Sequence, residues 1–279
     1  MGYKIVVDSC GELSEKMKTD GHFTSVPLTL EVGNETILDD ESFDQASFLQ
    51  KVADCPSCPK SACPSPAAYL DAYDCGEEHI YAVTLSSELS GSYNSAILAR
   101  EMFMEEHPGK KCYVFNSRSA SVGETLIALR IQQLEEQQIP FEQLVELVEE
   151  YIDTQHTYFV LDNLDTLRKN GRLSKVKAFV ASALKIKPIM GSTPEGNIAQ
   201  LGQTRGSNRA LVKMTDLVIA GVEPGQRRLA AISHCNCPDR AEIVRAALAS
   251  HLMLEDILVL PTAGVSSMYA NDGGVIVVI

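Results

Sequence analysis

The feature that most constrains the fold is an alternation of short apolar runs with amphipathic stretches of helical length. Tyr3–Val7, Ile80–Leu85 and Cys112–Phe115 have the length and composition of buried strands. Helical patterns at Ser92–Glu106 and Val122–Gln137 follow the second and third of these runs. Strand–loop–helix units in succession predict parallel pairing, because a parallel connection needs a crossover segment. We therefore expect an α/β fold whose first part holds a mainly parallel sheet.

A second set of strands and helices follows, and it suits a second α/β domain. A helix at Phe141–Ile152 closes the first set, and a strand at Tyr158–Leu161 opens the next. The chain has 279 residues, which fits two domains of ordinary size. We place the domains at residues 1–155 and 156–279. Further elements of the second domain are expected as helices at Leu164–Lys169, Lys175–Leu184, Arg209–Ala220 and Asp239–Leu252 and strands at Lys187–Met190, Ile198–Leu201, Arg228–Ser233, Ile257–Leu260 and Val275–Ile279.

Smaller elements are expected between the first two strands. Phe23–Leu30 and Glu35–Leu38 flank a Gly-Asn pair and predict a hairpin. Ser42 is placed to cap a helix at Phe43–Asp54. The segment Cys55–Pro66, rich in Pro, Cys and Ser, is expected to be a loop that leads into another helix.

The charge of the chain argues against some classes of partner. Asp and Glu number 37 against 24 Lys and Arg, a formal net charge of −13. Such a surface repels a phosphate backbone, and no run of basic residues forms a stripe, so we expect no nucleic-acid binding. No apolar stretch approaches the ~18–20 residues of a membrane span, so we expect no stable membrane insertion. A cytoplasmic monomer is the default expectation, and the eight cysteines are then expected as thiols.

The most informative loop is the serine-rich stretch Thr84–Ser95, between a strand and a helix. In open α/β sheets, ligands sit at the carboxyl ends of strands. A helix N-terminus there offers unpaired N–H groups to a single anion. Ser90 can reach that anion, and Gly91 lets a ligand approach the backbone. The alternative is that the serines only cap the helix.

Three other segments contain candidate residues. The helix predicted before Gly171 ends so that Arg172 projects from the turn, where Arg205 and Arg209 can join it in a cationic patch. Cations that favour the helix dipole are an adequate alternative for Arg172. The hydroxyls of Lys60–Pro66 precede a helix, although a surface turn explains them equally well. Small polar residues and paired glycines at Ala263–Gly274 suggest a backbone that passes close to another group.

Two kinds of chemistry stay open as alternatives to ligand binding. A hydrolase built on Ser90 lacks a G-x-S-x-G elbow, and the six histidines show no pattern. A metal or thiol module would use Cys55 and Cys58, since C-x-x-C is a zinc or thiol signature when a second pair is suitably spaced. Phosphate-binding glycine motifs are missing, and we expect no catalysis by the chain alone. Further ligands for such a module are Cys63, Cys75, His234, Cys235 and Cys237.

Five stretches in this order resemble the DegV family over nearly the whole chain. Leu164–Lys175 has Asn170 in place of the first glycine of the family pattern L-x-x-L-x-x-G-G-R-(I/V)-S-K. The other matching stretches are Val6–Ser9 for the opening strand and D-S turn, Lys60–Ser65 for T-S-x-P-S, Ser86–Ala96 for S-S-x-L-S-G-T-Y-x-S-A and Leu184–Pro188 for L-x-I-K-P.

The resemblance implies two α/β domains with a lipid-binding cleft between them and a long-chain fatty acid in a tunnel. It implies that Ser61, Ser90 and Gly91 hold the carboxylate, and that no other cofactor is present. It also implies that a partner kinase phosphorylates the exposed carboxylate to an acyl phosphate. The basic residues that would contact the kinase are Arg172, Arg205 and Arg209.

The main departure from the family pattern lies near the C-terminus. The family has a His before a G-P-G turn, and that His helps to hold the carboxylate. This chain has Tyr269–Gly274 in the corresponding place, without a His. Tyr269 and Asn271 are the residues expected to donate instead.

Overall fold

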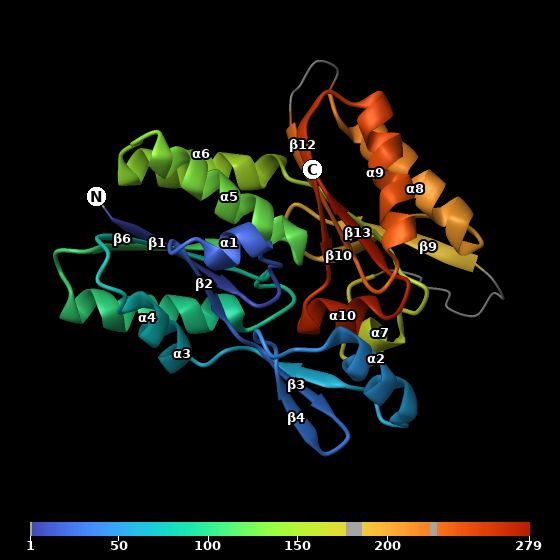
Figure 1. Cartoon of the computed structure of the whole chain (residues 1–279), viewed down its shortest axis with the longest axis horizontal. Helices are drawn as coiled ribbons and strands as arrows, with labels where there is room; N and C mark the ends of the chain where they lie inside the picture. Colours follow the sequence, from blue (N-terminus) through green and yellow to red (C-terminus); the bar gives the residue numbers. More distant parts are fainter. Residues whose placement is uncertain (1, 177–185, 224–227) are drawn as a thin grey trace.

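The computed structural model describes residues 2–176, 186–223 and 228–279. It shows two α/β units side by side, each built around its own sheet (Figure 1). The predicted two-part α/β architecture is therefore confirmed. The boundary between residues 155 and 156 stays a prediction.

The first unit contains a four-stranded sheet in the order β2-β1-β6-β7, and every neighbouring pair is parallel. The predicted parallel pairing is confirmed. The strands are β1 (Tyr3–Asp8), β2 (Phe23–Val26), β6 (His79–Thr84) and β7 (Lys111–Asn116).

Helices cover both faces of this sheet, as Figure 1 shows, with α5 and α6 above it and α3 and α4 below. Side chains along β1 alternate between the two layers: Ile5 and Val7 pack toward α5 and α6, and Val6 packs toward α3 and α4. The apolar alternation therefore sets the layers. The helices are α3 (Pro66–Tyr73), α4 (Ser92–Glu106), α5 (Val122–Glu136), α6 (Phe141–Thr154) and the short α1 (Glu15–Thr19), which was not predicted.

A small antiparallel sheet in the order β4-β3-β5 extends from the first unit. The hairpin is confirmed for β3 (Thr29–Val32) and β4 (Glu35–Leu38). The predicted long first strand is wrong, because Phe23–Val26 pairs with β1 instead. The expectation that Cys55–Pro66 is loop throughout is also wrong, since Lys60–Ala62 forms β5 and pairs with β3.

The cap predicted for the next helix is wrong by two residues. Helix α2 spans Gln45–Asp54, and Asp44 caps it by accepting the N–H of Ser47 at 2.6 Å. The Ser42 hydroxyl donates instead to Asp40, at 2.6 Å. The Ser42 hydroxyl is engaged in the turn at Asp40, so Asp44 caps the helix instead.

The second unit contains a six-stranded sheet in the order β10-β9-β8-β13-β11-β12. Its neighbours pair antiparallel except for β11 and β12. Helices α8 and α9 pack on one face. The elements are β8 (Thr157–Val160), β9 (Ile186–Ser192), β10 (Ile198–Arg205), β11 (Arg228–His234), β12 (Leu254–Pro261), β13 (Val275–Val278), α8 (Ser207–Gly221) and α9 (Pro238–His251).

The other face of this sheet looks toward the first unit. Ala231 and Val278 are buried there against Val122 and Leu126 of α5. Two short helices, α7 (Asp165–Lys169) and α10 (Gly264–Ala270), also lie on this side. Helix α10 was not predicted. The helix expected at 175–184 falls almost wholly outside the described residues.

Candidate functional site

A cavity of about 100 Å³ lies between the two units, within a wider hollow of about 760 Å³ that includes space open to solvent. The surface that it presents is almost entirely apolar. Its wall is shared by the β6–α4 and β7–α5 loops, the inner face of the six-stranded sheet and α10. The apolar residues that line it are Leu85, Leu89, Ala120, Phe159, Leu161, Leu167, Ile198, Val265, Ala270 and Ile276.

Two hydroxyls meet beside this cavity. Ser61 lies on β5 and Tyr269 on α10, and their oxygens are 3.1 Å apart. Tyr269 also lines the cavity. Burial raises the pKa of Tyr269, against the lowering effect of the Ser61 hydrogen bond, so the phenol stays neutral at physiological pH. The pair therefore presents neutral donors at the edge of an apolar space.

Ser90 and Gly91 lie at the N-terminus of α4, as expected, but outside the cavity wall. The Ser90 Oγ accepts the N–H of Ser92 at 3.2 Å and lies 3.1 Å from the Ser92 Oγ. This is a serine turn that satisfies the first N–H of α4, whose N-cap residue is Gly91. A Cβ on Gly91 would come within 3.0 Å of the Cys63 Sγ, so the contact between the two loops favours glycine. Their role in ligand binding stays a prediction.

Arg172 turns inward to the cavity wall. Its Nε donates to the carbonyl of Leu89 at 3.1 Å, and its Nη1 donates to the carbonyl of Asn170 at 2.7 Å. The guanidinium lies 5.6 Å from the centroid of the Tyr269 ring. A cation thus stands beside the hydroxyl pair, at a position that sequence reasoning assigned to partner contact.

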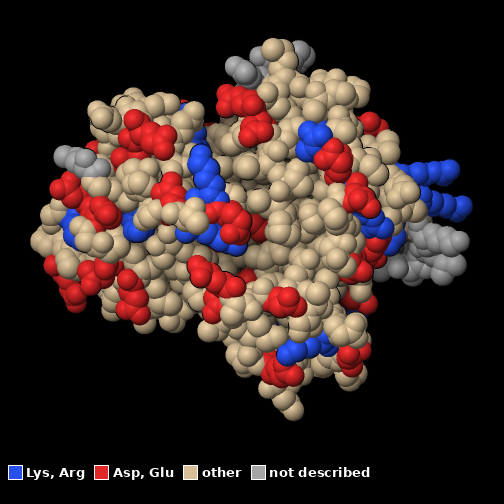
Figure 2. Space-filling view, viewed as in Figure 1, with Lys and Arg blue, Asp and Glu red and all other residues tan. Residues whose placement is uncertain are grey.

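Arg205 and Arg209 lie elsewhere, on exposed parts of β10 and the first turn of α8. Space-filling Figure 2 shows acidic side chains spread over the visible face, with basic ones fewer and scattered. Arg172 lies in the cavity wall, whereas Arg205 and Arg209 are exposed, so the three arginines do not form one patch.

Asn271 ends α10 and does not line the cavity. It adopts the left-handed region, with φ of 55°. Its Nδ2 donates to the carbonyls of Tyr269, at 3.1 Å, and Asn163, at 3.3 Å. Asn271 therefore fixes the turn after Tyr269, whereas a direct contact with ligand stays a prediction.

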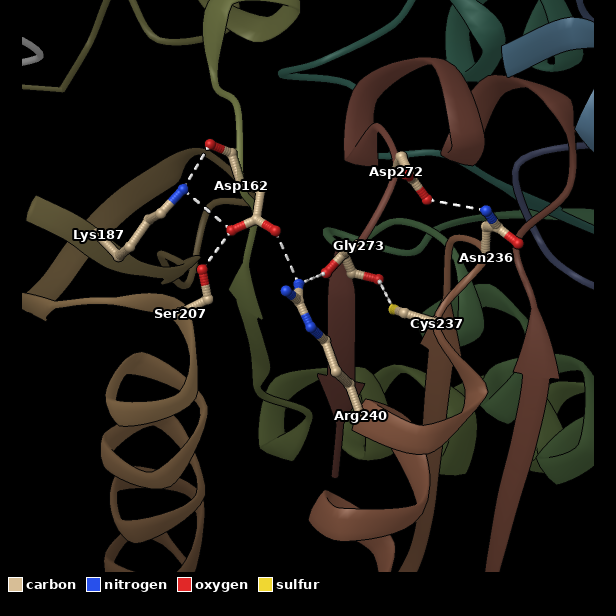
Figure 3. Close-up of polar contacts among 9 residues, drawn as sticks. Asp162, Lys187, Ser207, Asn236, Cys237, Arg240, Asp272 and Gly273 are labelled. Atoms are coloured by element: carbon tan, nitrogen blue, oxygen red, sulfur yellow. Dashed lines mark hydrogen bonds and ion pairs between the residues drawn. The ribbon is translucent and has the colours of Figure 1, made fainter. Parts of the chain in front are cut away.

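A charged network holds the turn that follows α10, as Figure 3 shows. Asp162, just after β8, accepts hydrogen bonds from Ser207 and from Arg240 at 2.8 Å, and pairs with Lys187 at 2.9 Å. Arg240 also donates to the carbonyl of Gly273 at 2.6 Å. Burial alone would raise the pKa of Asp162, but these partners outweigh it and lower the pKa to about 2.

Sequence reasoning missed several polar residues in the wall. The Ser119 Oγ and the Thr157 Oγ1, one from each unit, lie 2.6 Å apart. Ser121 adopts φ of 59° and lies 2.6 Å from the Ser233 Oγ, another contact between the units. The only signal for them was a serine-rich turn after β7, which is typical of many loops.

A family model described as "Uncharacterised protein, DegV family" matches residues 3–279. The chain belongs to the DegV family. A DegV domain-containing protein of Streptococcus pneumoniae is 34% identical over 280 residues, which cover 99% of this chain and 98% of the relative. The predicted family is confirmed.

Solved structures of DegV proteins share the fold over their whole length. A DegV family protein from Ruminococcus gnavus, solved with vaccenic acid, is 53% identical, with a TM-score of 0.96 over 100% of this chain and 99% of that one. The fatty acid kinase (Fak) B3 protein of Streptococcus pneumoniae, loaded with linoleic acid, is 31% identical, with a TM-score of 0.90 over 100% and 99%. The family fold, with two α/β domains, is therefore that of this chain.

The geometry of this DegV chain bears on the two alternatives, a hydrolase built on Ser90 and a metal or thiol module built on Cys55 and Cys58. The hydrogen bonds of the Ser90 side chain go to Ser92, with no His among them in the described residues. The possible metal ligands that cluster in the described ranges are Asp8, Cys10 and Glu124, all buried, rather than Cys55 and Cys58.

The buried cluster favours a proton over a metal. Asp8 already accepts the N–H groups of Cys10, at 3.1 Å, and Leu85, at 2.9 Å. Burial raises the pKa of Glu124 well above its ordinary value, and the charge of Asp8 adds to this effect. Neither buried carboxyl oxygen of Glu124 has a hydrogen-bond partner among the described residues, and this setting disfavours the ionised form that a metal ligand needs.

Proposed function

We propose that this DegV protein binds one long-chain fatty acid non-covalently, with the acyl chain in the cavity and the carboxylate at the Ser61–Tyr269 pair. The observation that carries the proposal is an apolar cavity between the two units whose wall includes Tyr269 and Arg172, with the Ser61 hydroxyl 3.1 Å from that of Tyr269. Ser90 and Gly91 would contribute the nearby helix N-terminus.

The relatives support this ligand class. The Ruminococcus gnavus structure at 53% identity holds vaccenic acid, and a DegV protein from Eubacterium eligens at 30% identity holds heptadecanoic acid. Both match almost the whole of this chain. The shared fold supports the same class of ligand here.

The energetics fit a carrier. Burying a long acyl chain is worth about 0.8 kcal/mol per methylene, on the order of 10 kcal/mol for a chain of common length. Ordering and desolvation cost about 4–15 kcal/mol. The tail therefore supplies most of the affinity, and the polar end sets the orientation through charge-assisted hydrogen bonds to the carboxylate.

We further propose that the protein performs no chemistry by itself and acts as a cytoplasmic, monomeric carrier that presents the acid to a fatty-acid kinase. The Fak B3 protein of Streptococcus pneumoniae, at 31% identity, supports this role by its name and bound linoleic acid. Arg205 and Arg209 are exposed and would contact the kinase, and Arg172 would orient the head group. Within the described residues, no helix combines the length and apolarity that a bilayer crossing requires.

Native mass spectrometry of the full chain tests the binding. We expect the purified protein to carry one long-chain acyl mass, which organic solvent extracts intact because it is not covalently attached. A protein that stays empty after incubation with vaccenate would contradict the proposal.

The kinase role has a separate test. Loaded protein, a fatty-acid kinase and ATP should yield acyl phosphate, and the double variant Arg205→Glu/Arg209→Glu should lower that yield while keeping its lipid. Arg245→Glu, an exposed charge reversal on α9, is the matched control. Equal yields from the three proteins would contradict docking through these arginines.

A further inference from the structure

The N-terminus of α10 is held by a carboxylate from the other unit. Asp39 Oδ1 accepts the N–H of Gly264 at 2.6 Å, and Oδ2 accepts the N–H of Val265 at 2.8 Å. The Ser9 hydroxyl donates to Oδ2 at 2.9 Å. Asp39 is only 3% exposed. One buried side chain thus satisfies two of the free N–H groups at the start of this helix.

The approach is close enough to require a glycine. A Cβ on Gly264 would lie 2.5 Å from the Asp39 Oδ1 and 2.9 Å from the Leu30 side chain. Any larger residue would push the carboxylate out of its place. The glycine in the Ala263–Gly274 stretch therefore marks the close backbone approach that the sequence suggested.

Two more residues of the first unit hold the same segment. The Gln45 Nε2 donates to the carbonyl of Thr262 at 2.9 Å and to the Ser267 Oγ at 3.0 Å. Glu12 accepts the N–H of Ala263 at 3.4 Å. The docking contact is thus polar and buried, and it joins residues more than 200 positions apart.

Helix α10 forms one wall of the lipid cavity. Val265, Ser266, Tyr269 and Ala270 line it. The helix has only seven residues, so fixing its first residue also fixes the position of Tyr269 near its other end. Displacing the docked end would open the cavity and separate Tyr269 from Ser61.

We propose that Asp39 is a positioning residue for this lipid site: it docks α10 onto the first unit, holds Tyr269 beside Ser61, and does so more firmly at acid than at alkaline pH. The lipid readout of this proposal rests on the proposed function, whereas the docking itself does not.

The direction of the pH effect follows from burial. Burial raises the pKa of Asp39 to about 6, although the N–H groups of Val265 and Gly264 and the Ser9 hydroxyl oppose the rise and Asp8 adds to it. Burial likewise raises the pKa of Glu12 to about 7. A carboxyl released into water would return toward its ordinary, lower value. The docked state thus binds protons more tightly, and docking weakens as pH rises from about 4 to about 7.

The surroundings of Asp39 do not reverse this sign. Asp8, on β1, faces it from the same buried region. Glu12, Lys18, Asp40 and Glu41 line the groove that Asp39 borders. Helix α10 carries no charged side chain. Acidic groups therefore outnumber the single lysine, and they favour protonation further.

Release of vaccenate from the loaded full chain tests the proposal at pH 5.5 and pH 8. We expect the acceleration of release between pH 5.5 and pH 8 to be about threefold or more larger in the wild type than in Asp39→Ala, given the size of the Asp39 pKa shift. Asp39→Ala should release it about fivefold faster than the wild type at pH 5.5, the usual effect of losing a helix cap, with a smaller difference at pH 8. Asp39→Asn should keep part of the retention at pH 5.5, because its single amide oxygen can accept one of the two N–H groups, and should lose the share of the pH dependence that Asp39 contributes while keeping that of Glu12.

Two further variants separate docking from general damage. Gly264→Ala should speed release at pH 5.5 without removing a titrating group. Asp71→Asn, at an exposed position on α3 away from this groove, should behave as the wild type. The titration of the ligand itself affects all variants equally, so only differences between variants are interpreted.

Hydrogen exchange of the empty protein separates the two proposals. The N–H groups of Ser267 and Asn271, bonded within α10, should lose protection in Asp39→Ala while those of β1 keep it. Wild-type release rates in Asp39→Ala together with unchanged α10 protection would overturn the positioning role and leave lipid binding intact. A wild type that never retains vaccenate, with the exchange pattern as expected, would overturn lipid binding alone.

Discussion

The hydroxyl of Ser61 lies 3.1 Å from that of Tyr269, although the two residues are 208 positions apart in the chain. One comes from an edge strand of the first unit and the other from a short helix attached to the second. Their meeting point beside the apolar cavity defines the head-group end of the proposed site.

Removing either hydroxyl should weaken lipid binding. Tyr269→Phe and Ser61→Ala should each raise the dissociation constant for vaccenate about tenfold, because a hydrogen bond to a charged group is worth about 1.5–3 kcal/mol. Fluorescence displacement or calorimetry measures this. Tyr93→Phe, which removes a phenol outside the cavity, should bind as the wild type. Unchanged affinity in both site variants would place the carboxylate elsewhere.

Filling the cavity should change the acyl chain that fits. Ala120 lines the cavity from the β7–α5 loop and is only half-buried. Ala120→Phe should exclude long chains and favour shorter ones, because packed interiors tolerate little added volume. Mass spectrometry of the extracted lipid reads the chain length, with exposed Ala246→Phe on α9 as control. An identical lipid profile in Ala120→Phe would show that the chain runs along another path.

The Asp162 network should make the second unit sensitive to acid. Its pKa of about 2 lies below the ordinary value, so its stabilising contribution is full above about pH 4 and is lost as pH falls toward 2. Asp162→Asn should lower the free energy of unfolding by about 1–2 kcal/mol at pH 7, a value reduced for partial exposure, and by less at pH 2. Urea unfolding measures this. Asp165→Asn, in an exposed ion pair, should cost almost nothing, and an equal loss at both pH values would contradict the network.

Glu124 should affect stability in the opposite direction to Asp162, by destabilising the fold as pH rises. Burial raises its pKa and disfavours ionisation in the fold, whereas the unfolded chain ionises it at the ordinary value, so Glu124 lowers stability as pH rises above about 4.5. Relative to the wild type, the neutral isostere Glu124→Gln should therefore be more stable at pH 7 than at pH 4. Urea unfolding at the two pH values measures the difference. A variant less stable at pH 7 than at pH 4, relative to the wild type, would show that Glu124 is ionised in the fold.

Local patterns explain why most elements could be predicted. Strand β1 alternates Ile5 and Val7 with Val6 because both faces of its sheet are covered, and the resulting apolar run is visible in the sequence. Helix α4 begins at Ser92 and ends at Glu106, both as predicted, since the signals at its ends are local. Where local signals competed, as between Ser42 and Asp44, the prediction chose the wrong cap.

Helix α10 shows what local signals cannot supply. Its sequence from Gly264 to Ala270 contains serine, valine and glycine, which favour helix weakly, and a helix this short is unstable alone. It forms here because Asp39, 225 positions earlier, caps it, and because its apolar side packs on the cavity. No spacing rule within the helix reveals that partner.

The sequence by itself determined the alternation of strands and helices, the parallel first sheet, the family and the loops that border the site. Only the tertiary structure decided that Ser61 meets Tyr269, that Arg172 turns into the cavity wall, and that Asp39 docks α10. The physical reason is that periodicity and capping act over a few residues, whereas these contacts join segments brought together by packing. Burial, which sets the protonation of Asp39 and Glu124, likewise exists only once the two units are assembled.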